Sequence, residues 1–192
     1  MLNEKIYVFD DIISVDSQND IKNLLIKDYE LDGRHPFPWY YIDDITLHAG
    51  DPRSQKRQGF THAYVNYEGR EKSTGKQVSR FHEIFVPMLQ IACLKLNIMN
   101  VNVLQGRSFL QVPLNLKNRD VDTPHIDILD RNNFFVVLYY VCDSDGDTII
   151  YNETKESDQY TIKQRVTPKQ GRVVIFDGVL MHTAEQPINN TR

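Results

Sequence analysis

The chain has 192 residues, of which 41% are hydrophobic and 25% are charged, the balance of an ordinary soluble globular protein. This composition excludes a disordered chain, a collagen and a coiled coil, and the length predicts a single domain over residues 1–192. The 22 Lys and Arg residues against 26 Asp and Glu give a formal charge of -4, so the basic excess typical of nucleic-acid-binding proteins is missing.

The cysteines and the apolar runs indicate the compartment. Cys93 and Cys142 are too few and too far apart for a disulfide framework or a zinc ribbon, which favours a reducing environment. The first residues hold no apolar signal core, and no run of about 18 apolar residues occurs. We therefore expect a cytoplasmic protein with neither a membrane nor a nucleic acid as partner. Composition does not predict the oligomeric state.

The first hundred residues predict helices mixed with aromatic loops. Ile6–Phe9 has the composition of a short strand, and a capping box at Ser17–Asp20 predicts a helix that runs to about Tyr29. Apolar residues at helical spacing predict a long amphipathic helix over residues 74–96, kinked at Pro87.

Two aromatic stretches in this half of the chain have two interpretations. Residues 35–42 contain prolines that forbid a helix and aromatics that favour a strand or an ordered loop, and residues 58–67 are similarly aromatic. Both stretches could form a lid or a recognition surface over a binding site. Ordinary packing in a hydrophobic core explains the same aromatics equally well.

From Asn102 onward, short runs of β-branched and aromatic residues alternate with turn sequences, such as those at residues 143–147 and 168–171. This pattern predicts a β-sandwich or barrel. The fold class is therefore α+β and mainly β, with residues 1–100 as helical support and variable aromatic loops, and residues 101–192 as the β-core. The predicted strands are Val103–Val112, Pro124–Leu129, Phe134–Cys142, Thr148–Asn152, Tyr160–Val166, Arg172–Phe176 and Leu180–Glu185.

The sequence around His125 is the first candidate for a functional site. His125 lies two residues before Asp127 on a predicted strand, and side chains at i and i+2 of a strand share a face. His182 follows the most hydrophobic late strand and is the natural third ligand. Two histidines and a carboxylate form the facial triad that leaves open positions on a metal such as Fe(II). Each residue alone has an ordinary structural explanation, but their order, strand context and spacing together favour a metal site.

These residues occur in a wider pattern. They are joined by the aromatic strand at residues 134–141, the Asp-Gly-Asp-Thr turn at 145–148, the Gly171–Phe176 segment and Arg192. The pattern resembles the Fe(II)- and 2-oxoglutarate-dependent dioxygenase superfamily, and within it the prolyl-hydroxylase-like branch. The resemblance covers about Val103 to Arg192. It implies a double-stranded β-helix, also called a jelly-roll or cupin-like core, supported by N-terminal helices.

The resemblance also implies roles for single residues. His125, Asp127 and His182 would hold Fe(II), and Arg192 would pair with the distal carboxylate of 2-oxoglutarate. Tyr140 matches a tyrosine that hydrogen-bonds the same carboxylate, although a core role would suit a strand aromatic equally well. In the family another core strand follows the basic residue, whereas this sequence stops at Arg192, so either the chain is a fragment or its sheet is completed in another way.

The same resemblance implies an activity. It is hydroxylation of a C–H bond, in a prolyl or other amino-acid residue, with consumption of O2 and release of succinate and CO2. The partners would be 2-oxoglutarate as cosubstrate and an unidentified small molecule or peptide. Two alternatives from other classes stay open. One is a non-redox cupin-like protein that holds Zn, Ni or Mn, and the other is a catalytically silent β-barrel interaction module.

Overall fold

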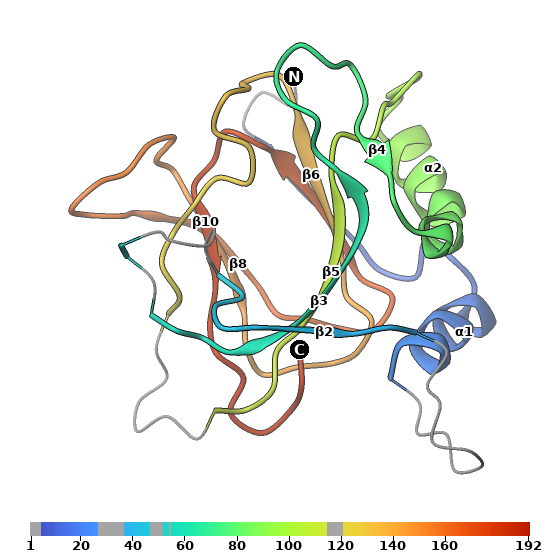
Figure 1. Cartoon of the computed structure of the whole chain (residues 1–192), viewed down its shortest axis with the longest axis horizontal. Helices are drawn as coiled ribbons and strands as arrows, with labels where there is room; N and C mark the ends of the chain where they lie inside the picture. Colours follow the sequence, from blue (N-terminus) through green and yellow to red (C-terminus); the bar gives the residue numbers. More distant parts are fainter. Residues whose placement is uncertain (1–4, 27–36, 47–51, 54, 115–120) are drawn as a thin grey trace.

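The structure is a computed structural model that describes residues 5–26, 37–46, 52–53, 55–114 and 121–192. Its strands form antiparallel sheets, and its helices lie together on one side (Figure 1). No helix in these described ranges is both long enough and apolar enough to cross a membrane.

One sheet has the order β1-β9-β6, and its central strand is the most buried in the protein. The strands are β1 (Ile6–Phe9), β9 (Val173–Asp177) and β6 (Phe135–Tyr139). All five residues of β9 are buried, and alternate residues pack on opposite faces. Val174 and Phe176 join an inner cluster, while Val173 and Ile175 join a cluster that includes helix residues.

A second sheet has the order β10-β7-β8 and carries part of the candidate site. Its strands are β7 (Thr148–Tyr151), β8 (Ile162–Val166) and β10 (His182–Ala184). The segment 121–125 runs antiparallel to β10 through isolated bridges at its two ends, and so extends this sheet by an irregular fourth member.

The third sheet is built around β3 (Gly59–Asn66), which pairs with β2 (Tyr40–Ile42), β4 (Lys76–Gln77) and β5 (Gly106–Leu110). The sequence pattern predicted no strand over residues 59–66. Because β3 carries both buried aromatics such as Tyr64 and small or polar residues, its sequence lacks the regular alternation that marks a strand and resembles that of a loop.

Helix α1 (Val15–Ile26) and helix α2 (Val86–Lys95) pack beside these sheets. Ile21 and Leu25 of α1 join a core cluster with Tyr64, whereas Met88 and Ala92 of α2 pack in the cluster of β9. Both helices therefore pack against one side of the sheets (Figure 1).

Three local predictions were wrong. Residues 74–96 do not form one helix, because β4 is followed by a 3-10 helix (Arg80–Phe85) and α2 begins only at Val86. Pro87 lies in the first turn of α2, where its missing N–H removes no helical hydrogen bond, so it starts a helix and does not kink one. Helix α1 begins at Val15, not at the predicted capping box.

Ser14, and not Ser17, caps α1: its hydroxyl oxygen accepts a hydrogen bond from the Ser17 backbone N–H at 3.2 Å. The predicted strand over Pro124–Leu129 is the third error. Only His125 in this range makes a bridge, Asp127 lies in a bend, and residues 129–130 form a turn. The predicted end of the first helix near Tyr29 and residues 35–36 lie outside the described residues.

We predict that an ion pair at the end of β1 sets part of the acid stability. Asp10 accepts hydrogen bonds from Arg172 Nε at 2.7 Å and Nη2 at 2.9 Å. These bonds lower the pKa of Asp10 from 3.8 to about 2, against the opposing effect of burial. Since the folded-state pKa is depressed, the stabilisation is complete above the unfolded value and is lost as the pH falls toward about 2.

Asp10→Asn should lower the free energy of unfolding at neutral pH by roughly 1 kcal/mol, a value reduced for the partial exposure of the pair. It should also flatten the fall in stability below pH 4 or so, because the variant has no carboxylate to protonate there. Urea unfolding across the acid range measures both effects. Asp158→Asn, at an exposed carboxylate, is the matched control, and identical acid profiles for wild type and Asp10→Asn would contradict the prediction.

Candidate metal centre

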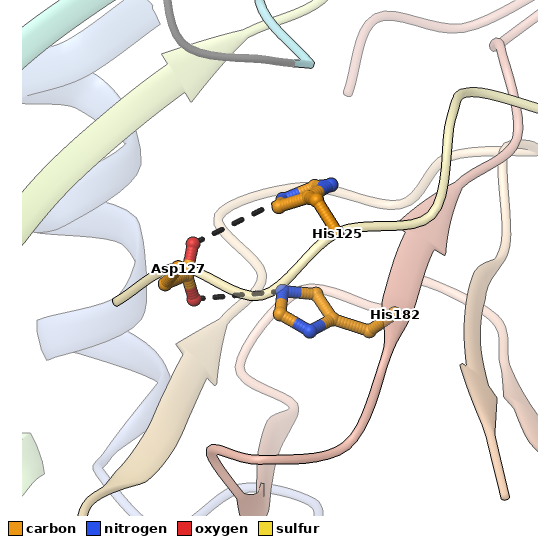
Figure 2. A group of neighbouring side chains, drawn as sticks. All are labelled: His125, Asp127 and His182. Carbon is orange, nitrogen blue, oxygen red and sulfur yellow. Dashed lines mark ion pairs between the residues drawn. The ribbon is translucent and has the colours of Figure 1, made fainter. Parts of the chain in front are cut away.

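Three predicted ligands meet at one point in the structure (Figure 2). One ligand atom each from His125, Asp127 and His182 lies within 4.8 Å of the others. The Asp127 carboxylate faces both rings, with Oδ2 at 3.5 Å from His182 Nε2 and Oδ1 at 3.9 Å from His125 Nε2. Among the described residues this is the one group of three or more His, Cys, Asp or Glu side chains with such convergence.

The backbone places the two histidines directly opposite each other. The His125 N–H donates to the His182 carbonyl at 3.0 Å, and the His182 N–H donates to the His125 carbonyl at 3.0 Å. Side chains of such an opposed pair lie on the same face, and here the ring centroids are 4.8 Å apart. Asp127 reaches the rings from the bend that follows His125, not from a continuing strand.

Hydrogen bonds also fix which imidazole nitrogen is available. His125 Nδ1 lies 3.2 Å from the Thr123 carbonyl oxygen, and His182 Nδ1 lies 3.1 Å from the Leu180 carbonyl oxygen. A carbonyl oxygen can only accept, so both Nδ1 atoms carry the proton. The Nε2 lone pairs, which point toward Asp127, are therefore the ones that a metal ion can use.

The charges of the cluster support a cation site. Burial alone would raise the pKa of Asp127, but the charge and hydrogen bond of His182, with the charges of His125 and Arg107, hold it well below its usual range. Burial alone would lower the pKa of His182, and the neighbouring Asp127 carboxylate raises it. The carboxylate is thus ionised, and a metal ion would replace the positive charge that the imidazoles otherwise provide.

A second polar group involves the other two predicted site residues. Tyr140 donates its hydroxyl hydrogen to Thr148 Oγ1 at 2.6 Å, and Arg192 Nη2 donates to the same Thr148 oxygen. The Arg192 guanidinium carbon lies 6.0 Å from the centroid of the Tyr140 ring. Arg192 Nη1 donates to Gln111 Oε1 at 2.9 Å, and its buried Nε has no hydrogen-bond partner among the described residues.

Both groups line one cavity of about 2250 Å³. Sequence reasoning therefore selected residues that the fold brings together: His125, Asp127 and His182 in one group, and Tyr140 and Arg192 in the other. It left Thr148 out, although Thr148 matches a threonine in the turn of the resembling family and that match was a usable signal. Gln111 carried no sequence signal, because its contacts come from distant segments.

A buried carboxylate stands behind Arg192. Asp122 is 1% exposed and accepts hydrogen bonds from Gln186 Nε2 at 2.6 and 2.7 Å and from Gln111 Nε2 at 3.2 Å. Arg57 Nε lies 3.4 Å from the same carboxylate. Burial raises the pKa of Asp122 to about 6, with these donors and cations opposing the rise, so the group is ionised at neutral pH. Gln111 links this charge to the Arg192 guanidinium.

Comparison with solved structures identifies a protein of similar fold. No protein-family model matches the chain, and no curated protein matches its sequence. Among solved structures, the chain is similar to an oxidoreductase of the 2OG-Fe(II) oxygenase family from Burkholderia pseudomallei, with a TM-score of 0.67 and 11% sequence identity. The match covers 100% of this chain and 83% of that chain. The two proteins share a mainly β fold, and this degree of identity establishes no more than the fold.

We predict that loss of the Asp122 carboxylate destabilises the fold. Asp122→Ala removes the carboxylate beside the buried Arg57 guanidinium and the acceptor of the Gln186 and Gln111 amides, which should cost about 3 to 5 kcal/mol in free energy of unfolding. Asp122→Asn keeps one acceptor oxygen and should cost less. Urea denaturation at pH 7 measures the free energies of unfolding of wild type and both variants. Equal stability of Asp122→Ala and wild type would contradict the view that Asp122 balances a buried cation.

Proposed function

We propose that the protein is an Fe(II)- and 2-oxoglutarate-dependent oxygenase that hydroxylates a C–H bond on a double-stranded β-helix core. The observation that carries this proposal is one cavity that holds two different groups. The His125, Asp127 and His182 cluster offers a metal three ligands, and the Arg192, Tyr140 and Thr148 cluster offers a carboxylate several hydrogen-bond donors. A metal-binding barrel without the cosubstrate would have no need for the second group.

The residues fit both bound groups chemically. Two imidazoles whose Nε2 atoms face an ionised carboxylate form, with it, the donor set of a facial triad. The buried and unpartnered Nε of Arg192 shows that this guanidinium is not saturated by the described residues. A bidentate carboxylate would satisfy the remaining donors of Arg192. The fold likeness to a 2OG-Fe(II) oxygenase supports the same assignment.

In the proposed mechanism, Fe(II) held by the triad would couple O2 reduction and the decarboxylation of 2-oxoglutarate to oxidation of the substrate. The chain supplies binding, orientation and exclusion of water. The two Nδ1 hydrogen bonds lock the imidazole rings, and Phe176 packs edge-on against His182 at 5.1 Å between centroids. Leu180 is fully buried behind the same strand, which keeps that side of the metal site dry.

The Arg192 group would orient the cosubstrate. Arg192 provides the charge for its distal carboxylate, and Gln111 holds the guanidinium in place. Burial raises the pKa of Tyr140, so its hydroxyl keeps its proton at neutral pH and remains a hydrogen-bond donor. Thr148 lies between Tyr140 and Arg192 and keeps the two donors aimed at the same point.

For the substrate, the sequence resemblance to the prolyl-hydroxylase-like branch supports a prolyl or other amino-acid acceptor, free or in a peptide. The aromatic segments proposed as a recognition surface include exposed Tyr40 and Tyr41 of β2. They leave ring faces available at one sheet edge for a flat or cyclic group.

We predict that anaerobic titration of the Fe(II)-loaded protein with 2-oxoglutarate produces the weak visible band of a chelated keto acid. His182→Ala, His125→Ala and Asp127→Ala should each abolish the band and the formation of succinate, because each removes one of three metal ligands. His82→Ala, at a histidine outside the cluster, is the matched control and should keep both.

Each other outcome assigns a different function. Iron binding without the band would favour the non-redox metal protein, and no metal binding would favour the interaction module. Retained succinate formation in any ligand variant would exclude that residue from the centre.

We predict that Arg192→Gln raises the 2-oxoglutarate concentration required for half-saturation by about tenfold or more, since a charge-assisted bond is worth roughly 1.5 to 3 kcal/mol. Arg192→Lys should require a 2-oxoglutarate concentration between those of wild type and Arg192→Gln, because lysine keeps the charge but lacks the planar guanidinium. Metal affinity should stay unchanged in both variants. Isothermal titration with the cosubstrate measures the effect, and an unchanged affinity in Arg192→Gln would remove this residue from the cosubstrate site.

A further inference from the structure

Arg107 is one of the other arginines that line the cavity, and it lies along strand β5 from the Arg192 group. Arg107, Phe109 and Gln111 alternate along and just beyond β5, so their side chains share one face. Gln111 marks the Arg192 end of this row through its hydrogen bond. Arg107 marks the other end, where its charge acts on the metal ligand Asp127. The proposed chemistry uses Arg192 and Gln111 but leaves Arg107 without a role.

The guanidinium of Arg107 is held in place yet keeps one edge available. With its amide oriented to satisfy both groups, the Gln105 oxygen accepts from Arg107 Nε at 3.1 Å and also from Nη2. The edge formed by Nη1 and Nη2 is the one that recognises a carboxylate in a bidentate manner. Among the described residues, no carboxylate forms a salt bridge with Arg107, and the residue is exposed.

The surroundings of Arg107 are those of an entrance. A second hollow of about 520 Å³ shares Arg107 and Asp127 with the main cavity, so these two residues lie where the spaces meet. Desolvation lowers the pKa of Arg107, and the Asp127 charge opposes this shift. A group bound there would lie beside the reacting centre.

We propose that the primary substrate carries a single anionic group, a carboxylate, which pairs with Arg107 beside the His125, Asp127 and His182 cluster. This inference rests on the proposed function, because it concerns the substrate of the same site. The hollow also contains the exposed carboxylates of Glu68 and Asp130. These charges repel a polyanion such as a nucleic acid and restrict the attraction to one localised negative group.

The cosubstrate is the other carboxylate that could reach Arg107, and strand geometry argues against it. Gln111 lies four positions after Arg107, and four steps along a strand span about 13 Å. A five-carbon diacid whose distal carboxylate is bound by Arg192 is shorter than this span. A bound metal ion would also neutralise the Asp127 charge that otherwise offsets Arg107. The guanidinium would then lack a counter-charge from Asp127, which favours binding of another anion.

Ligand-observed NMR on the Mn(II)-loaded protein, saturated with 2-oxoglutarate, tests the proposal without requiring turnover. The probes are two matched pairs, N-acetyl-L-proline with N-acetyl-L-prolinamide and acetate with acetamide. A methyl resonance that binds beside Mn(II) is broadened by the paramagnetic ion, and the Zn(II)-loaded protein provides the diamagnetic reference. We expect broadening of the carboxylates, weaker broadening of the amides, and about a tenfold loss of carboxylate affinity in Arg107→Gln.

Two variants control for charge and folding. Arg70→Gln removes an exposed arginine of the same charge near the hollow and should bind the carboxylates like wild type, while Arg107→Lys should retain part of the affinity. Thermal unfolding should give Arg107→Gln the same midpoint as Arg70→Gln.

Three results would overturn the inference while the proposed function stands: no carboxylate is broadened with or without 2-oxoglutarate, Arg107→Gln binds carboxylates like wild type, or the carboxylates are broadened only when 2-oxoglutarate is left out. The third result would make Arg107 a cosubstrate contact. The failure of Mn(II) or 2-oxoglutarate to bind at all is a distinct outcome. It would overturn the proposed function and this inference together.

Discussion

The geometry of the candidate centre depends on one pair of backbone hydrogen bonds, between His125 and His182. An antiparallel pair in this register places both imidazoles on the same face, and a slip of one residue would turn one ring away from the other. The bend after His125 then brings Asp127 to both rings, and the backbone carbonyls of Thr123 and Leu180 orient them. The sheets around this pair supply rigidity, since β9 and Leu180 are fully buried behind it.

A similar pairing fixes the far end of the cavity. Arg192 and Gln111 exchange two backbone hydrogen bonds, at 2.7 and 2.8 Å, and a side-chain bond besides. The Gln111 amide then reaches the buried Asp122, whose charge is shared with Arg57. Asp122 is also tied to the first pair, because its N–H donates to the Ala184 carbonyl two residues beyond His182. The candidate metal ligands and the Arg192 group are therefore positioned by one connected set of strand contacts.

Much of this arrangement could be predicted where local pattern and chemistry agree. The strand at Ile6–Phe9 has its predicted bounds. The predicted ligands His125, Asp127 and His182 converge in the structure although Asp127 does not lie on a strand, so the candidate site could be selected from residue types and spacing. Periodicity failed over residues 74–96, because it cannot distinguish a strand and a 3-10 turn from the helix that follows them. Contacts such as those of Gln111 depend on pairing between distant segments, which single-sequence patterns do not encode.

The charges in the cavity connect these features to substrate choice. The partners of Arg192 that lie within hydrogen-bond distance are a hydroxyl and an amide, and Asp122 is balanced by Arg57. Within the group formed by the candidate metal ligands, Arg107 and Arg192, Asp127 is the one carboxylate, while Asp43, Asp44 and Glu156 line the wider cavity. A dianionic cosubstrate would leave one positive charge beside the metal ligands, and this charge is costly in an enclosed space. A substrate with one carboxylate would neutralise it, whereas a cationic substrate would increase it.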